Sequence, residues 1–303
     1  MKSTVFVTGC LGNLGWKATM LLASDERFDR VLACDLGQPI EEQAEQLSVL
    51  PNVEFVRCDL SRWQDLRWRG RILDADMVIH FAAQNPFPEA SWQDVAISMD
   101  ITNHITTALL ASEKPQRLVY ISSNHVMGRY KDSLFGKSDS TGRLRTDLEL
   151  GVGTIWNTGL KVIDSTGYAT VKLAGERTCR AVSEASNGRI TSVSVRIGWC
   201  QPGENHPSTL SAAGSITIER ADEKAKDLSL VETDRWFQEM WLSNRDLSQI
   251  IEKSLTAPAV TWPSPSIVVN GMSHNSGMVW SLEEGENWLG YIPMDDVYQI
   301  LGR

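Results

Sequence analysis

The stretch Val5-Phe6-Val7-Thr8-Gly9-Cys10-Leu11-Gly12-Asn13-Leu14-Gly15 joins a short apolar segment to a helical one. Its glycines are spaced G-x-x-G-x-x-G, directly after a predicted strand over residues 4–8 and before a predicted helix over residues 14–23. Gly9 permits a tight turn, Gly12 lets the backbone approach a phosphate, and Gly15 allows close contact between helix and strand. The helix N-terminus adds unpaired N–H groups and the positive end of its dipole. The stretch therefore predicts a dinucleotide site that includes Asn13 and Leu14.

Further strands and helices alternate along the first two thirds of the chain. Apolar runs predict strands over residues 30–35, 53–58, 77–81, 117–122 and 192–197. Amphipathic stretches predict helices over residues 40–47, 92–112 and 168–185. Six strands in this order predict an α/β fold with a doubly wound parallel Rossmann sheet.

The pattern changes after Gly198. Residues 202–207 are typical of a loop, residues 211–227 are irregular and charged, and residues 234–255 predict one helix. We therefore expect an NAD-binding Rossmann domain over residues 1–198 that carries the catalytic residues. A smaller substrate-binding lobe over residues 199–303 would lean on it.

Composition narrows the class of protein. A 303-residue chain with 42% hydrophobic residues can bury a large core, and its net charge of −9 disfavours nucleic-acid or anionic-membrane binding. No signal-like or membrane-spanning run occurs, so we expect a cytoplasmic protein that binds a small molecule. The cysteines lack the spacing of a zinc site, which predicts no metal and buried thiols: Cys10, Cys34, Cys58, Cys179 and Cys200.

Asp35 indicates which dinucleotide is bound. It ends the second predicted strand about 20 residues after Gly15, where a carboxylate accepts hydrogen bonds from ribose hydroxyls and repels a 2′-phosphate. Since no arginine or lysine directly follows it, NAD is preferred to NADP. Asp59-Leu60 follows the third strand, where Asp59 either reaches the adenine or is an ordinary turn residue. Phe81-Ala82-Ala83 would let the chain pass under the cofactor, whereas we interpret His80 as a core residue.

Tyr168 and Lys172 suggest proton-transfer chemistry. They are four residues apart on a predicted helix and so project from one face. Ser123 follows the fifth predicted strand, at the carboxyl edge where ligands bind in open α/β sheets. Tyrosine with a pKa near 10 is a poor base at neutral pH, but a neighbouring ammonium favours its phenolate. We expect Tyr168 to remove a hydroxyl proton, Lys172 to assist it and hold the nicotinamide ribose, and Ser123 to orient the reacting oxygen.

These motifs resemble the extended short-chain dehydrogenase/reductase family, also described as the NAD-dependent epimerase/dehydratase family. Within it, the strings over residues 122–128 (SSNHVMG) and 195–200 (VRIGWC) are most similar to uronate dehydrogenases, which oxidise hexuronates to lactones. The resemblance implies substrate contacts at Asn85, Ser123, Asn124, His125, Tyr168 and Trp199. It also implies that Arg235 holds a sugar carboxylate, and it predicts a homo-oligomer.

Two segments are longer than the resemblance leads us to expect, one between Gly128 and Tyr168 and one between Cys200 and Arg235. They contain several tryptophans, for which core positions are favoured over an apolar platform for a sugar ring: Trp156, Trp199, Trp236 and Trp241.

Three functions fit the sequence. The first is NAD-dependent oxidation of a free sugar or sugar acid, as in a uronate-type aldose 1-dehydrogenase. The second is a nucleotide-sugar epimerase or dehydratase with tightly bound NAD, which the acidic C-terminal part disfavours. The third is a non-catalytic NAD sensor, against which the complete Ser/Tyr/Lys set argues.

Overall fold

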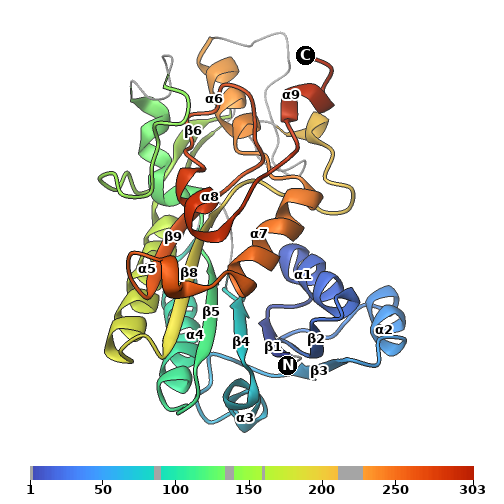
Figure 1. The fold of residues 1–303 in the computed structure, drawn as a ribbon. Coiled ribbons are helices and arrows are strands. Elements are labelled where there is room, and N and C mark those ends of the chain that lie inside the picture. The colour runs from blue at the N-terminus through green and yellow to red at the C-terminus, as the bar shows by residue number, and fades with distance from the viewer. Residues whose placement is uncertain (1–2, 85–89, 134–139, 159–160, 211–227) are drawn as a thin grey trace.

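The computed structural model describes residues 3–84, 90–133, 140–158, 161–210 and 228–303. A parallel sheet of seven strands lies between two layers of helices (Figure 1). The strand order is β3-β2-β1-β4-β5-β8-β9, so the chain runs outward from β1 in both directions. The sheet strands are β1 (Ser3–Thr8), β2 (Phe28–Asp35), β3 (Val53–Arg57), β4 (Met77–His80), β5 (Gln116–Ile121), β8 (Ile190–Ile197) and β9 (Ser266–Gly271). The doubly wound Rossmann fold is therefore confirmed.

The helices follow the alternation that the sequence predicted, with additions. The α-helices are α1 (Asn13–Ser24), α2 (Glu41–Ser48), α3 (Leu66–Asp74), α4 (Trp92–Leu110), α5 (Thr166–Ala185), α6 (Leu228–Glu239), α7 (Asn244–Thr256), α8 (Glu283–Leu289) and α9 (Val297–Ile300). Three 3₁₀ segments are η1 (Asn124–Asp132), η3 (Pro207–Thr209) and η5 (Ala259–Thr261), and a small antiparallel sheet pairs β6 (Ile155–Asn157) with β7 (Val162–Asp164).

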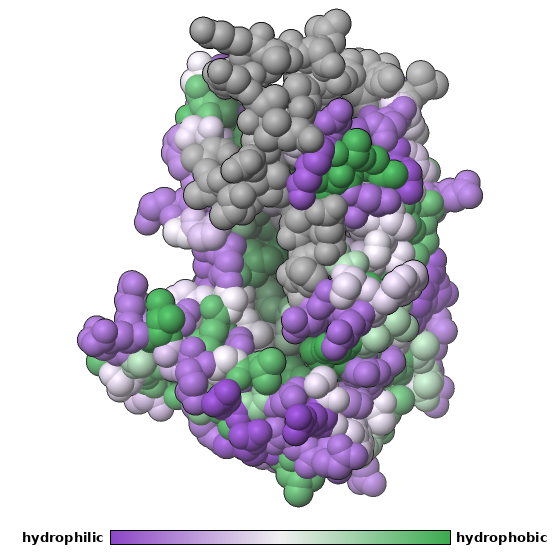
Figure 2. Space-filling model, turned by 180° about the vertical axis from the view of Figure 1, so that it is seen from behind, coloured by the Kyte–Doolittle hydropathy of each residue, from purple (hydrophilic) through white to green (hydrophobic). Residues whose placement is uncertain are grey.

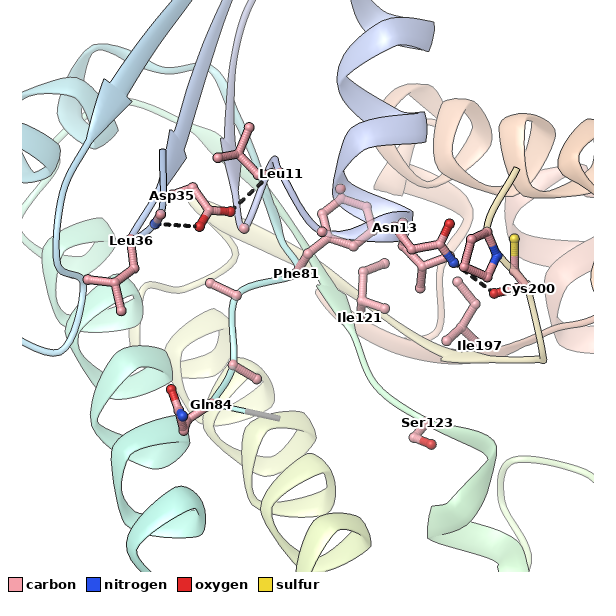
Figure 3. A pocket seen from close by; sticks show the side chains of 18 of the residues that line it. Leu11, Asn13, Asp35, Leu36, Phe81, Gln84, Ile121, Ser123, Ile197 and Cys200 are labelled. Atoms are coloured by element: carbon pink, nitrogen blue, oxygen red, sulfur yellow. Dashed lines mark hydrogen bonds between the residues drawn. The ribbon is translucent and has the colours of Figure 1, made fainter. Parts of the chain in front are cut away.

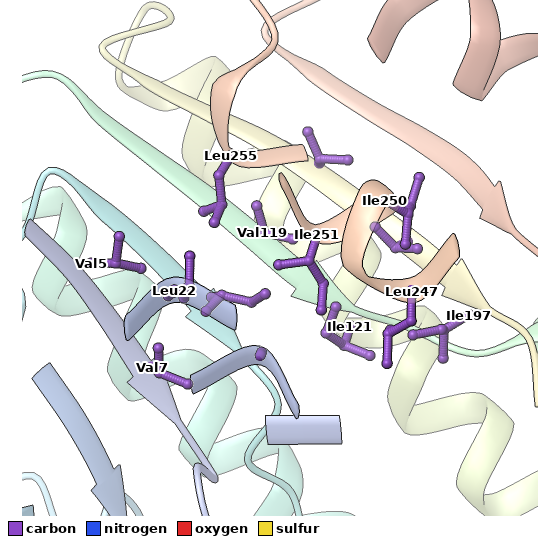
Figure 4. Close-up of a cluster of buried hydrophobic side chains, with 14 of the residues drawn as sticks. Val5, Val7, Leu22, Val119, Ile121, Ile197, Leu247, Ile250, Ile251 and Leu255 are labelled. Atoms are coloured by element: carbon purple, nitrogen blue, oxygen red, sulfur yellow. The ribbon is translucent and has the colours of Figure 1, made fainter. Parts of the chain in front are cut away.

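Alternating side chains of the central strands divide the core into two faces. Val5 and Val7 of β1 belong to one buried cluster and Phe6 to the other. The first cluster contains residues of α1 and α7, such as Leu22 and Ile251 (Figure 4). The second contains residues of α3, α4 and α5. This period-two pattern is what a sheet covered on both faces requires.

A third buried cluster, rich in tryptophan and methionine, lies beyond the carboxyl end of the sheet. It joins Trp156 and Ile163 of the β6–β7 pair to Trp236 and Phe237 of α6. The pair and α6 lie together at the end of the molecule farthest from the N-terminus (Figure 1). Residues from both sides of position 198 therefore build this part of the core.

The division at residue 198 also differs from the structure of the sheet. Strand β9 pairs in parallel with β8 over residues 266–271, and α7 packs on the sheet beside α1. Both elements lie in the segment that the sequence assigned to a separate lobe. The reason is that β8 offers an open ladder edge, which the backbone of β9 pairs while Ile267 and Val269 are buried in the core.

The single helix predicted over residues 234–255 is wrong. Helix α6 ends at Glu239, and α7 begins at Asn244 after Ser243, whose hydroxyl accepts a hydrogen bond from Asp246 N. Between the two helices, Trp241 forms an isolated parallel bridge with Trp199. The tertiary pairing overrides a helical pattern that would otherwise continue.

The described surface is mixed in character. Hydrophilic and hydrophobic residues are interspersed on the face that Figure 2 shows. Within the described ranges, no helix combines the length and apolar character needed to cross a bilayer.

Replacing Leu22 by Ala tests the contact between α1 and the sheet. Leu22 is 0% exposed in the first cluster, so the substitution should lower the free energy of unfolding by about 2–5 kcal/mol. Urea titration of the two proteins measures the difference. Leu66→Ala is the matched control, because Leu66 is also helical but 68% exposed, and its effect should stay within about 0.5 kcal/mol. Equal losses for the two variants would contradict the assignment of this face.

Candidate active site

A cavity of about 1370 Å³ opens along the carboxyl ends of the central strands. It reaches from Asp35 at the end of β2 to Tyr168 at the start of α5. Figure 3 shows Asp35 on one side of the cavity and Ser123 on the other, with Phe81 and Ile121 between them. This is the edge at which open α/β sheets bind ligands.

The glycine-rich turn after β1 forms part of the wall. Gly9 has a φ of +69°, and a Cβ there would lie 2.9 Å from Ala82 N. A Cβ on Gly15 would lie 2.1 Å from the carbonyl oxygen of Gly9, whereas one on Gly12 would meet only that oxygen, at 3.4 Å. Gly9 and Gly15 are thus required by the turn itself, and Gly12 leaves room beside the cavity, which Asn13 and Leu14 also line.

Asp35 lies at the end of the cavity beside the β1–α1 turn. Its carboxylate accepts hydrogen bonds from Leu11 N and from Gly37 N, each at 3.0 Å. These bonds fix the carboxylate at the cavity wall, and each oxygen keeps a lone pair for a further donor.

Asp59 and Leu60 line the same end of the cavity. Asp59 also accepts from Ser61 N at 3.0 Å and from the Ser61 hydroxyl at 2.6 Å. It therefore has the geometry of a turn residue and a position on the wall.

The floor of the cavity passes over β4. Phe81, Ala82 and Ala83 line it, and Ala82 N donates to the Thr8 hydroxyl at 3.1 Å. His80 lies beneath, 1% exposed, with Nδ1 2.7 Å from Thr8 Oγ1 and Nε2 3.2 Å from Thr102 Oγ1. Burial lowers the pKa of His80 to about 3, with the Lys172 charge contributing. His80 is a neutral, hydrogen-bonded core residue.

Ser123, Asn124 and His125 all lie at the cavity wall, where β5 passes into η1. The Ser123 hydroxyl accepts from His125 N at 3.2 Å, and Asn124 Nδ2 donates to Ile197 O at 2.9 Å. His125 Nδ1 lies 2.7 Å from the Thr154 hydroxyl and 3.1 Å from that of Ser165. Burial lowers the pKa of His125 to about 3, so its imidazole is neutral at physiological pH.

Tyr168 and Lys172 reach the cavity from the first turns of α5. Lys172 Nζ donates to Ile121 O at 2.9 Å and lies 5.8 Å from the centre of the Tyr168 ring. Burial lowers the pKa of Lys172 from its ordinary value of 10.5 to about 8. The structure therefore brings Ser123, Tyr168 and Lys172 to one wall, with the ammonium near the phenol.

A buried ion pair lies behind this wall, and the sequence did not predict it. Arg196 on β8 and Glu176 on α5 are joined by two hydrogen bonds of 3.0 Å, and Ser122 donates to Glu176 at 2.6 Å. Glu176 is one turn after Lys172, so the pair ties the face of α5 that carries Lys172 to the ends of β5 and β8. The spacing Tyr168-x-x-x-Lys172-x-x-x-Glu176 was the available signal.

Trp199 is half-buried and lines the cavity, whereas Trp156, Trp236 and Trp241 are each less than 5% exposed. The last three are therefore core residues. Trp199 and His125 rings meet edge to face at 6.4 Å, which makes an aromatic corner beside Ser123. The wall continues with six residues that were not identified from the sequence: Cys200, Gln201, Pro202, Glu204, Asn205 and His206.

One predicted substrate contact, Arg235, is not brought to this wall. Arg235 does not line the cavity; its guanidinium lies 2.5 Å from Glu239 on the same helix, and its side chain is 59% exposed. Side chains four residues apart on a helix meet, which explains this pairing. Asn85 lies outside the described residues.

The charge of the wall is unbalanced. Among the described residues that line the cavity, Lys172 is the only lysine or arginine, whereas Asp35, Asp59 and Glu204 are acidic. In the same described ranges, no three His, Cys, Asp or Glu side chains come together as a metal site would need.

Comparison with known proteins relates this geometry to a family. Residues 5–148 match the model of the NAD dependent epimerase/dehydratase family. No curated protein sequence matches the chain.

Solved structures share the fold. A UDP-glucuronic acid 4-epimerase from Bacillus cereus, in complex with UDP-glucuronic acid and NAD, has a TM-score of 0.68 at 14% identity, covering 99% of this chain and 96% of that one. A UDP-galactose 4-epimerase has a TM-score of 0.66 at 15% identity, covering 98% and 96%. The Bordetella bronchiseptica enzyme WbmG, in complex with NAD and UDP, has a TM-score of 0.64 at 15% identity, covering 100% and 93%.

Replacing Gly15 by Ala tests the close approach in the β1–α1 turn. The added Cβ would lie 2.1 Å from Gly9 O, a backbone atom that cannot rotate away, so the free energy of unfolding should fall by about 1–3 kcal/mol. Gly70→Ala in α3 is the control: its Cβ meets nothing within 4 Å, and stability should be unchanged or rise by up to about 1 kcal/mol. Thermal or urea unfolding of both variants decides, and a tolerated Gly15→Ala would refute the geometry.

The lowered pKa of Lys172 predicts a pH-dependent contribution to stability. Between about pH 8 and pH 10.5 the unfolded chain binds a proton at Lys172 that the folded protein has released, so this contribution rises with pH. The free energy of unfolding of the wild type minus that of Lys172→Met should grow by up to about 3 kcal/mol across this window. Urea titrations measure it, with the interval from pH 6 to pH 7 as the flat control. A difference that is constant up to pH 10.5 would contradict the burial of the ammonium.

Proposed function

Residues 5–148 match the NAD dependent epimerase/dehydratase family, and on that premise we propose that this chain is an NAD-dependent enzyme that oxidises a sugar hydroxyl at Tyr168. We further propose that it is a nucleotide-sugar epimerase or dehydratase, in which the cofactor stays bound through turnover. The observation that carries the proposal is the single cavity that joins the glycine turn and Asp35 to Ser123, Tyr168 and Lys172.

The residues at the Asp35 end fit NAD. The turn at Gly9, Gly12 and Gly15 brings backbone close to the start of α1, and the helix N-terminus offers N–H groups to a diphosphate. The Asp35 carboxylate is held at the wall and would accept hydrogen bonds from ribose hydroxyls. Asp59, Leu60 and the 81–83 segment would enclose the remainder of the cofactor.

The chain's own groups supply the proton chemistry. Lys172 places an ammonium 5.8 Å from the centre of the Tyr168 ring, which favours the phenolate form of Tyr168. The phenolate oxygen would take the proton of a sugar hydroxyl, and Ser123 would orient that hydroxyl by a hydrogen bond. NAD, when bound, accepts a hydride from the carbon that bears the hydroxyl. In the reverse direction Tyr168 returns the proton to the oxygen.

The cavity of about 1370 Å³ exceeds the range of about 300–1,000 Å³ for a single drug-sized ligand, so it has room for NAD together with a second molecule. The comparisons support a nucleotide sugar as that molecule. Structures with this fold include complexes with both NAD and a UDP-sugar. The neutral His125, the Asn124 side chain and Trp199 would contact the sugar.

A second function, NAD-dependent oxidation of a free sugar acid such as a uronate to its lactone, is favoured by the charge of the wall. A diphosphate is usually held by several cations, yet Lys172 is the only lysine or arginine among the described residues of the lining. This function would require an anion-binding group other than Arg235, which pairs with Glu239.

The test incubates the purified full-length protein with UDP-glucose, UDP-glucuronic acid or free hexuronates and follows both NADH absorbance and sugar products. The proposal expects an epimerised or dehydrated nucleotide sugar without net NADH. Steady NADH formation with a free sugar acid would replace it by the second function. If NAD binds but neither NADH nor a sugar product forms with any of the sugars, the result would support a sensor instead.

Replacing Tyr168 by Phe should lower kcat by about 10²–10⁴-fold, because the proton acceptor is lost. NAD binding, measured by calorimetry, should persist. Tyr130→Phe is the matched control, since the Tyr130 hydroxyl donates to Glu149 O away from the cavity lining and its loss should leave kcat unchanged. Full turnover by Tyr168→Phe would sink the proposed mechanism.

A further inference from the structure

Residues 199–206, which we call the strap, lead from the end of β8 to η3, and most of them line one wall of the cavity. Cys200, Gln201 and Asn205 are among its lining residues. The strap faces the turn that begins α1, so it lies across the part of the cavity that the glycine turn opens. How firmly it is held there decides how easily that part of the cavity opens.

Lys17 of α1 holds the strap at Gln201 and Gly203. Its ammonium donates to Gln201 O at 2.8 Å and to Gly203 O at 3.0 Å, both backbone carbonyls of the strap. It also donates to Asn244 Oδ1 of α7 at 2.5 Å. One turn earlier on the same face of α1, Asn13 Nδ2 donates to Cys200 O at 2.9 Å (Figure 3).

Asn205 anchors the C-terminal end of the strap. It has a φ of 57°, a left-handed conformation that asparagine tolerates better than most residues. Its Oδ1 accepts from Gln201 N at 2.7 Å, and its Nδ2 donates to Leu242 O at 2.6 Å. The Trp241 indole donates to Asn205 O at 3.0 Å. The start of the strap is also fixed, because Trp199 N donates to Met240 O at 2.7 Å and Leu242 N donates to Trp199 O at 2.8 Å. Between these two anchors, at Gln201 and Gly203, the strap is held to α1 by Lys17.

The part of the strap that Lys17 holds is more exposed than the anchor at Asn205. Gly203 and its neighbour Pro202 are exposed, whereas Asn205 is 2% exposed. A strap fixed at Trp199 and Asn205 and released at Lys17 could move away from α1 between these two anchors without disturbing the sheet. The Lys17 ammonium, with three oxygen acceptors, is the group best placed to prevent this opening.

We propose that Lys17 is a positioning residue that keeps the strap closed over bound NAD, so that the cofactor is retained from one turnover to the next. The inference rests on the proposed function, because it presumes that NAD occupies this cavity. Lys17 is not among the residues that line the cavity and acts through the strap. It would favour chemistry that returns the hydride, since such chemistry needs no exchange of cofactor.

The experiment measures the rate of NAD dissociation from the full-length protein by stopped-flow fluorescence. Lys17→Met keeps the aliphatic stem and removes the donations to the three oxygens and to Cys200 Sγ, so dissociation should accelerate about tenfold. Asn244→Ala leaves the charge of Lys17 in place but removes its side-chain acceptor and the Asn244 donation to Gly203 O, and should accelerate dissociation about threefold. A wild-type rate in Lys17→Met would overturn the inference, because the two strap carbonyls would then be held without the ammonium.

Lys114→Met is the matched control. Its ammonium also donates to a backbone carbonyl, that of Asp74, but at the opposite edge of the sheet. The variant should release NAD at the wild-type rate. Faster release here would mean that any lost lysine contact has this effect, which overturns the inference.

Hydrogen exchange of residues 200–204 without added NAD gives a readout independent of the cofactor. Lys17→Met should accelerate exchange in the strap and leave β5 unchanged. If the wild type binds NAD but neither its release nor strap exchange responds to Lys17→Met, the inference fails and the proposed function stands. If the wild type does not bind NAD, both fail.

Discussion

The close approach of Gly15 to the carbonyl of Gly9 is the constraint on which the site depends. A Cβ at Gly15 would stand 2.1 Å from that oxygen, so only glycine lets α1 begin directly above the end of β1. This contact points the helix N-terminus along the carboxyl edge of the sheet and places Leu22 and its neighbours on the first core face. The same turn therefore sets both the cofactor end of the cavity and one half of the hydrophobic core.

The reactive end depends on a different constraint. Tyr168 and Lys172 are on α5, Ser123 follows β5, and the wall beyond them continues from β8. The buried pair of Arg196 and Glu176, with the Ser122 hydroxyl, joins these elements just behind the cavity. Isolated buried charges are costly, so each partner holds the other in place, and the groups in front of them share that fixed geometry.

The charge and the closure of the cavity bear on function in different ways. A lining with one lysine suits a weakly anionic ligand, and a cavity larger than one drug-sized ligand needs has room for a second molecule beside a dinucleotide. A strap held by Lys17 and Asn13 favours a cofactor that stays bound. The two proposed functions, hydride return and net oxidation, would share the first proton transfer at Tyr168, so the fate of the reduced cofactor would distinguish them.

The sequence by itself determined the sheet-and-helix alternation, the glycine turn, Asp35 and the Tyr168/Lys172 pair, because each is encoded within one strand–turn–helix unit or one helical turn. Only the tertiary structure decided the features that join distant segments. Lys17 meets Gln201 across 184 positions, and β9 pairs with β8 although α6 and α7 lie between them in the chain. Tertiary contacts also broke the helix predicted over residues 234–255, and the local pairing of Arg235 with Glu239 kept that guanidinium from the cavity. Hydrophobic periodicity predicts which face of a helix or strand is buried. Which other element packs against that face depends on the packing of the whole chain.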